Sequence, residues 1–304
     1  NLAPGADPAD VPTARASGGG LTAFLVGGMA WAGVGLAAAV GLAFVVNALA
    51  ARLLSEDDLG AFLVMLSIAQ AVSVVVELGQ PGLIAREIAG RLEDDHEARR
   101  AFVSRSLLLV AAAGLGLVVL TAVAGRPFAR VVFDEPAVTA VFALLGLVVL
   151  PRAFERTLGD VFRGLADIRG ATIFGTAWVQ AAGAAALGVL LVVRDRTTAD
   201  VALLAYAVAG ITVLPVGIAV LRRSLPLSLP RTGYRYHAVE GWPLIGYRLL
   251  SMVLQQAPLW IVAGAIGTSD AAPFGLALRV VTMIAVPMTV ANQVVPPIVA
   301  RLFQ

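Results

Sequence analysis

The stretch LTAFLVGGMAWAGVGLAAAVGLAFVVNALAA, residues 21–51, runs for about thirty residues without a charge. An α-helix needs ~20 predominantly apolar residues to cross the ~30 Å hydrocarbon core of a bilayer. The run is also roughly twice as long as the apolar core of a secretory signal. We therefore interpret it as a retained membrane span, and we expect the fold to be built from such spans.

The composition agrees with this interpretation. Of the 304 residues, 59% are apolar and only 14% are charged, and the mean hydropathy is +0.88. A soluble domain is about one quarter charged, so this chain has too few polar residues to cover a globule in water. The composition excludes a soluble enzyme, a nucleic-acid-binding protein and a disordered tail. The absence of Cys excludes disulfides and thiolate metal ligands.

Further apolar segments follow the first. We predict an all-α integral membrane protein with about eight transmembrane helices, preceded by a flexible tail at residues 1–20. The predicted spans are residues 21–51, 60–78, 106–124, 138–158, 171–193, 199–221, 242–266 and 272–295.

The arginines alternate between the connections. Thirteen are counted with the connections after spans 2, 4 and 6, including Arg152 and Arg156 near the end of span 4, whereas five follow spans 1, 3, 5 and 7. The positive-inside rule therefore places the even-numbered connections and the N-terminus in the cytoplasm of a bacterial cell. The charged segment 86–105 is typical of an amphipathic helix on the membrane surface. The thirteen are Arg86, Arg91, Arg99, Arg100, Arg105, Arg152, Arg156, Arg163, Arg169, Arg222, Arg223, Arg231 and Arg235.

An internal repeat relates the second span to the eighth. A shift of 215 residues aligns Gly60 with Gly275, Pro81 with Pro296, and Arg86 with Arg301. Because the shift covers six spans, both copies cross the membrane in the same direction, as in parallel lobes of six helices. We predict a first lobe over residues 21–240 and the start of a second over 241–304, so the chain is expected to be truncated.

Polar side chains inside the spans are candidate sites, since each is costly in lipid unless it meets a partner or a water-filled cavity. Arg248, Ser251 and Gln255 share one face of span 7, and Arg279 lies well inside span 8. The two arginines either grip a phosphate in a cavity, or they snorkel to an interface or pair with an acid inside the bundle.

Two further residues complete the candidate substrate-binding set. Glu77 precedes the helix-breaking run 79–82 and is either a transport residue or a helix-end carboxylate. Asn47 in span 1 is either a ligand or an interhelical hydrogen-bond partner. The chain has no P-loop, and His96 and His237 lack metal-ligand spacing, so we predict no cofactor and no metal.

Several motifs resemble those of the polysaccharide transporter family, the O-antigen flippase type. They are ARLLSEDDLGAF at residues 51–62, ELGQPGLIAR at 77–86, FRGL at 162–165 and the segment 263–296 with Phe274, Gly275 and Arg279. The resemblance extends over nearly the whole chain from Leu21. It implies the multidrug/oligosaccharidyl-lipid/polysaccharide (MOP) exporter superfamily and a MATE-like arrangement of two lobes around a cavity lined by spans 1, 2, 7 and 8.

The implied activity is transport rather than enzymatic. A flippase would move a polyprenyl-pyrophosphate-linked oligosaccharide across the cytoplasmic membrane for cell-surface polysaccharides such as O-antigen or exopolysaccharide. Its expected partners are this substrate, membrane lipids, H⁺ or Na⁺ as a coupling ion, and polysaccharide assembly proteins, with no nucleic acid. The alternatives are a lipid II flippase, a drug or cation antiporter, and a membrane polymerase or glycosyltransferase using Asp134 and Glu135.

Overall fold

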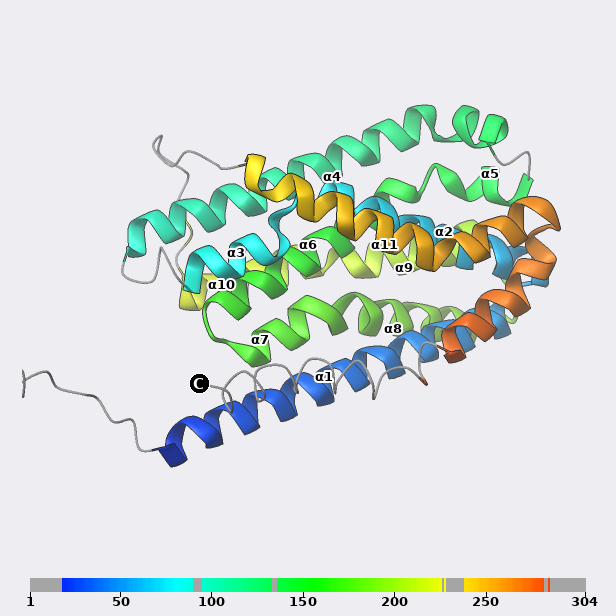
Figure 1. Ribbon diagram of the computed structural model, residues 1–304. Coiled ribbons are helices and arrows are strands. Elements are labelled where there is room, and N and C mark those ends of the chain that lie inside the picture. Colours follow the sequence, from blue (N-terminus) through cyan, green and yellow to red (C-terminus); the bar gives the residue numbers. More distant parts are fainter. Residues whose placement is uncertain are drawn as a thin grey trace, which may run out of the picture.

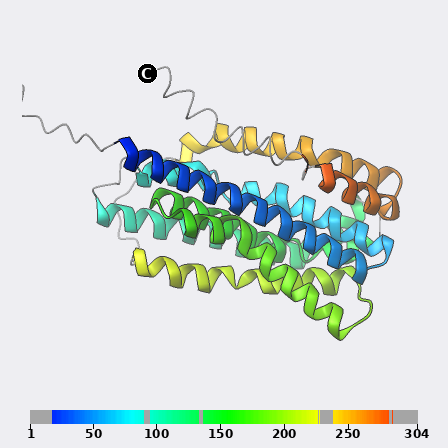
Figure 2. The same cartoon turned by 90° about the horizontal axis from the view of Figure 1, so that it is seen from below.

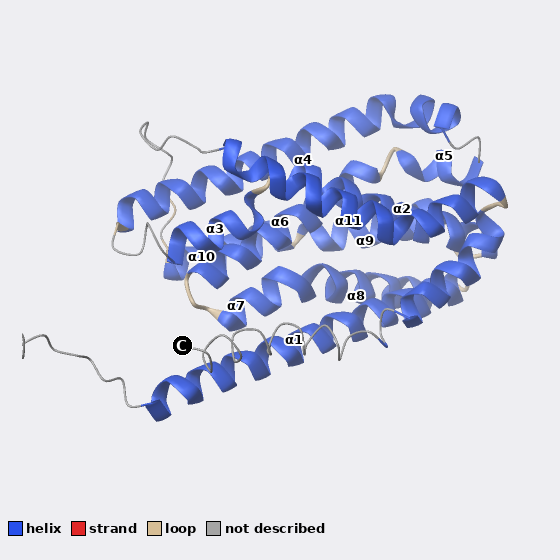
Figure 3. Ribbon diagram, viewed as in Figure 1, coloured by secondary structure: helices blue, strands red, loops and turns tan. Residues whose placement is uncertain are grey.

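A computed structural model describes residues 18–89, 95–132, 136–225, 227, 238–281 and 284. Within these ranges the chain is helical and contains no strand (Figures 1 and 3). Long helices lie side by side in both views of the bundle (Figures 1 and 2). The helices are α1 (Gly18–Leu53), α2 (Glu56–Val76), α3 (Gln80–Ala89), α4 (His96–Val132), α5 (Pro136–Phe142), α6 (Leu145–Gly164), α7 (Ile168–Thr172), the π-helix η2 (Ile173–Ala177), α8 (Trp178–Val193), α9 (Ala199–Ile211), α10 (Val213–Ser224) and α11 (Ala238–Ala265). Residues 268–281 form a further helix.

Five of the helical segments are long and apolar enough to cross a membrane by length and composition. They are Gly33–Leu53, Glu56–Val76, His96–Val131, Ile168–Val193 and Ala199–Ser224. Large apolar side chains face outward along them, for example Val123 and Val192 at 78% and 88% exposed. Such an apolar outer surface suits lipid rather than water. The prediction of an all-α, multi-pass membrane protein is confirmed.

Where the structure describes them, the predicted spans fall mainly on helical residues, but three of the spans are interrupted. A turn at residues 143–144 separates α5 from α6, the π-helix η2 lies between α7 and α8, and Thr212 separates α9 from α10. The Thr212 side chain is held at its break, since its hydroxyl donates to the Ala209 carbonyl and accepts from Trp178 Nε1. These breaks are local features that hydropathy alone does not reveal.

The α2–α3 junction shows how the helix-breaking run folds. Ser55 caps the start of α2 by accepting a hydrogen bond from the Asp58 backbone N–H. At its other end, Leu78 and Gly79 adopt positive φ angles of 51° and 70° and turn the chain. α3 then begins at Gln80, with Pro81 in the first turn, where a missing N–H is tolerated.

α6 occupies the centre of the bundle, in contact with α2, α3, α4 and α9. It approaches η2 closely because two glycines face each other. A Cβ on Gly159 would lie 2.5 Å from the Gly175 Cα, so neither position accepts a side chain without separating the helices. The buried core extends around α6 and includes Phe62, Phe154 and Leu187.

Two predictions about charged segments are wrong. Arg152, Arg156 and Arg163 lie within α6 rather than in a connection, because the helix continues to Gly164. The segment 86–105 is divided between α3 and α4 and is not one surface helix. Residues 90–94 between them are outside the described part of the chain, as are Arg15, Asp134, Glu135 and His237.

The helix of residues 268–281 packs against α2, which joins the two copies of the predicted repeat. A Cβ on Gly60 would lie 1.8 Å from the Thr268 carbonyl oxygen, and one on Gly275 would lie 3.0 Å from Leu63 Cδ1. The two aligned glycines thus lie on one interface. Pro296 and Arg301 are outside the described residues, and the division into lobes stays a prediction.

Candidate functional site

α6 carries a line of charged side chains through the bundle. They recur every three or four residues, which places them on one face of the helix. Glu155, next to this line, is 4% exposed. Ionisable groups at membrane depth are rare unless they meet partners or a water-filled space, so this face is a candidate site. Its members are Arg152, Arg156, Asp160 and Arg163.

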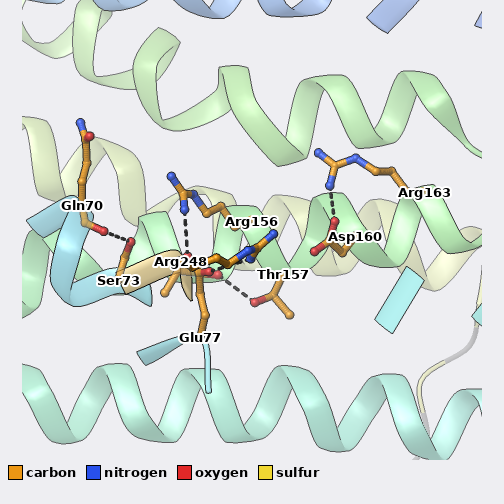
Figure 4. A network of polar contacts seen from close by, with 9 residues as sticks. Gln70, Ser73, Glu77, Arg156, Thr157, Asp160, Arg163 and Arg248 are labelled. Atoms are coloured by element: carbon orange, nitrogen blue, oxygen red, sulfur yellow. Dashed lines mark hydrogen bonds and ion pairs between the residues drawn. The ribbon is translucent and has the colours of Figure 1, made fainter. Parts of the chain in front are cut away.

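Glu77 caps the C-terminus of α2 and lies between two cations (Figure 4). Its side chain is 1% exposed. Arg156 Nη1 of α6 lies 3.5 Å from Oε1, and Arg248 Nη1 of α11 lies 3.8 Å from Oε2. Both distances exceed the length of a good hydrogen bond, and neither carboxylate oxygen accepts one from the described residues. Charge rather than tight hydrogen bonding therefore holds this buried group.

The remaining contacts of the same network stay within single helices (Figure 4). They are Ser73 Oγ to the Gln70 carbonyl at 2.8 Å, Thr157 Oγ1 to the Ala153 carbonyl at 2.8 Å, and the ion pair of Arg163 with Asp160. Only the two ion pairs of Glu77 cross between helices here. Through them, one carboxylate joins α2, α6 and α11.

A second polar cluster surrounds Tyr206 of α9, which is 0% exposed. Arg152 Nη2 donates to its hydroxyl oxygen at 2.6 Å, and the hydroxyl donates to Gln180 Oε1 at 3.2 Å. The ring also packs edge-on against Phe62 of α2. A buried phenol with both hydrogen-bonding roles filled fixes its neighbours in place. Tyr206 thus positions the Arg152 guanidinium.

Arg279 reaches this second cluster from the helix of residues 268–281. Its guanidinium interacts electrostatically with Arg152 and Tyr206. The two arginines repel each other, and an anion placed between them would be stabilised by both. Because Arg152 and Arg156 are one turn apart on α6, the two clusters are neighbours.

The α2–α11 interface adds uncharged polar contacts. Trp260 Nε1 donates to Ser67 Oγ at 2.7 Å, and Gln256 Nε2 donates to Gln70 Oε1 at 3.2 Å. These bonds link the predicted start of the second lobe to the first. Gln256 lies next to the predicted face of Arg248, Ser251 and Gln255. It is Gln256, and not Gln255, that bonds to α2.

The predicted site residues therefore separate into two groups. Arg248, Glu77 and Arg279 belong to the charged clusters. Gln255 is exposed, and its side-chain amide donates to Ser251 Oγ at 3.2 Å. Both residues are on α11, so this hydrogen bond does not link α11 to another helix. Asn47 of α1 is 3% exposed, and its Oδ1 accepts no hydrogen bond from the described residues.

Sequence reasoning missed Arg152, Arg156 and Tyr206. The spacing of charges at 152, 156, 160 and 163 was a usable signal, because it predicts one helical face. Counting these arginines as connection residues concealed it. Nothing in the sequence around Tyr206 distinguishes it from an ordinary core aromatic.

The described residues hold no group of three His, Asp or Glu side chains that could bind a metal ion. The arginine clusters instead suit an anion, because guanidinium groups donate in pairs to phosphate or carboxylate oxygens. Apolar helices outside and a charged face inside define a multi-pass membrane protein that handles a polar solute.

The family of polysaccharide biosynthesis proteins matches residues 25–303. The chain therefore belongs to this family, the polysaccharide transporters of the MOP exporter superfamily. Membership supports a polysaccharide transporter or flippase role and is consistent with a non-enzyme. Searches among curated proteins and among solved structures gave no match.

Proposed function

We propose that the protein is a flippase that moves a polyprenyl-pyrophosphate-linked oligosaccharide across the bacterial cytoplasmic membrane. The observation that carries the proposal is the approach of two guanidinium groups, from α6 and α11, to one buried carboxylate. An interior able to hold a carboxylate between Arg156 and Arg248 is equipped to hold a phosphate. The family match supports the transport of a polysaccharide or its precursor.

The physical requirement explains why arginines are needed. A pyrophosphate headgroup that carries sugars cannot enter hydrocarbon, because the desolvation of its charges is prohibitive. Arginines on the inner face of the helices replace the lost hydration with charge-assisted hydrogen bonds. The polyprenyl tail stays in lipid, alongside the apolar outer surface.

The proposal includes an orientation and two moving parts. The N-terminus lies in the cytoplasm, so α2 runs from the outside inward and Glu77 lies toward the cytoplasmic side. Residues 21–240 form one lobe, and residues from 241 onward begin the other. Transport then follows from the two lobes rocking about the arginines between them.

Replacement of two arginines tests the site. The double variant Arg248→Ala with Arg279→Ala is expected to abolish surface polymer export, measured by glycan staining in a strain that depends on this protein. The matched control is Arg222→Ala, because Arg222 is exposed at the end of α10. Immunoblots of the membrane fraction establish that each variant is present. Normal export by the double variant would contradict the site.

A further inference from the structure

The polar contacts between α2 and α11 form an ordered ladder. Ser67 meets Trp260, Gln70 meets Gln256, and Glu77 meets Arg248. The positions rise along α2 as they fall along α11, so the two helices run antiparallel. The ladder extends from the middle of α2 to its C-terminal cap.

The two ends of this interface are held by different forces. Toward the start of α2, Val64 clusters with Leu259 and Ala263, and the Gly60 backbone lies against the Thr268 carbonyl. Apolar packing and close backbone approach make that end rigid.

At the opposite end, the ion pair of Glu77 with Arg248 joins the two helices. The neighbouring α11 residues Tyr247 and Leu250 are 74% and 61% exposed. At this end of α11 the Glu77–Arg248 ion pair joins the helix to α2, and the apolar residues Ile245 and Leu249 are half-buried.

The Glu77 ion pairs leave donors of both arginines poorly used. At 3.5 and 3.8 Å, the carboxylate attracts the guanidinium groups without making good hydrogen bonds. The Arg156 and Arg248 side chains are 37% and 43% exposed, so the described part of the chain does not cover them, whereas Glu77 is buried. A phosphate presents more acceptor oxygens and more charge than a carboxylate, and it accepts bidentate bonds from each arginine.

We propose that Glu77 is an internal stand-in for the anionic headgroup. A diphosphate binds Arg156 and Arg248 in its place, and the loss of the Glu77–Arg248 ion pair releases the N-terminal end of α11 from α2. The inference rests on the proposed function for the identity of the anion. It adds the mechanism that couples headgroup binding to movement of the second lobe, since a ligand shifts a conformational equilibrium only through contacts that differ between states.

Two variants separate the parts of this mechanism. Glu77→Gln removes the competing charge and leaves both arginines, so a diphosphate should bind between about threefold and tenfold more tightly, as expected for the loss of a partly screened ion pair. Arg248→Gln breaks the same ion pair from the other side and should weaken binding at least about tenfold. Both variants should release α11 without added ligand.

The test uses the protein in lipid nanodiscs with farnesyl diphosphate as the probe. The described chain has no Cys, so spin labels at Val75→Cys on α2 and Tyr247→Cys on α11, both exposed positions, report the distance between the helices. Farnesyl diphosphate should lengthen this distance in the otherwise unaltered protein. Glu77→Gln and Arg248→Gln should show the longer distance at once, and binding should be tightened only by Glu77→Gln.

Asp58→Asn is the matched control, because Asp58 is an acidic residue of the same helix whose partners are Ser55 and the Ala199 backbone. It should change neither the distance nor the binding. An unchanged distance in both Glu77→Gln and Arg248→Gln would overturn the release of α11. Unchanged or weaker diphosphate binding by Glu77→Gln would overturn the proposal that the diphosphate takes the place of Glu77. The arginine site and the proposed function would still stand. The distance measurement without ligand is independent of the substrate and stays informative if no lipid-linked glycan is transported.

Discussion

Arg248 of α11 lies 3.8 Å from the carboxylate of Glu77 at the end of α2, and this ion pair joins the start of the second predicted lobe to the first. The same carboxylate lies 3.5 Å from Arg156 of α6. One buried anion therefore connects the central helix of the bundle with the helix that has to move if the lobes separate. A ligand that binds these arginines therefore also controls the connection of α11 to α2.

The Arg156–Glu77 pair is expected to contribute measurably to stability. Removing one partner of a buried ion pair costs ~3–5 kcal/mol, and the partial exposure of Arg156 reduces this to about 1–3 kcal/mol. Arg156→Ala should therefore lower the Tm of the purified protein in detergent. Adding Glu77→Gln to Arg156→Ala should restore part of the loss, because the buried group then no longer carries a charge that Arg248 alone must balance. A double variant less stable than Arg156→Ala alone would contradict this coupling.

Gly60 is expected to tolerate no side chain. A Cβ there would lie 1.8 Å from the Thr268 carbonyl oxygen, so Gly60→Ala forces α2 away from the following helix. Overpacking of this kind destabilises by ~1–3 kcal/mol, which a thermal melt of the purified protein detects. Gly41→Ala is the matched control, because a Cβ on Gly41 meets no atom within 4 Å. Equal melting of the two variants would mean that the contact with Thr268 is not required.

Tyr206→Phe tests the second cluster. The substitution keeps the ring but removes the hydroxyl that accepts from Arg152 and donates to Gln180. Leaving these half-buried groups without this partner should destabilise the protein by about 1 kcal/mol and lower polymer export, since Arg152 loses its fixed position. Tyr247→Phe changes a 74% exposed residue in the same way and should leave the melting temperature unchanged. Equal melting temperatures for Tyr206→Phe and Tyr247→Phe would contradict the positioning role of the Tyr206 hydroxyl.

The orientation is open to chemical labelling. The sequence contains no Cys, so single introduced cysteines are labelled without background. Asp195→Cys, after span 5, should react with a membrane-impermeant maleimide in intact spheroplasts, whereas Arg223→Cys, after span 6, should react only after permeabilisation. Both native residues are exposed, so access from the correct side is the only difference expected. The reverse pattern would place the N-terminus outside.

The sequence was sufficient to predict the helical class, because apolar runs of bilayer length have few other stable solutions. It did not predict the breaks at residues 143–144 and Thr212, which depend on local turns and on a side-chain contact with Trp178. α6 begins after the first break and runs to Gly164, so the helix ends six residues beyond the predicted span 138–158.

The charged site could be predicted only in part. Arg248, Arg279 and Glu77 were recognisable as ionisable residues within apolar segments. Arg156 and Arg152 were not, because an arginine near the predicted end of a span looks the same whether it lies in a loop or on a helix. The partner of each residue comes from a distant helix, and no local pattern encodes such a pairing.

The most direct test of the central claim is a flipping assay in proteoliposomes. The purified protein is reconstituted with a fluorescently labelled undecaprenyl-pyrophosphate-linked oligosaccharide, and a membrane-impermeant quencher reports its appearance in the outer leaflet. The label is expected to become accessible faster than in protein-free liposomes, and Arg156→Ala with Arg248→Ala is expected to remove the acceleration. A rate equal to that of protein-free liposomes, from correctly folded protein, would contradict it.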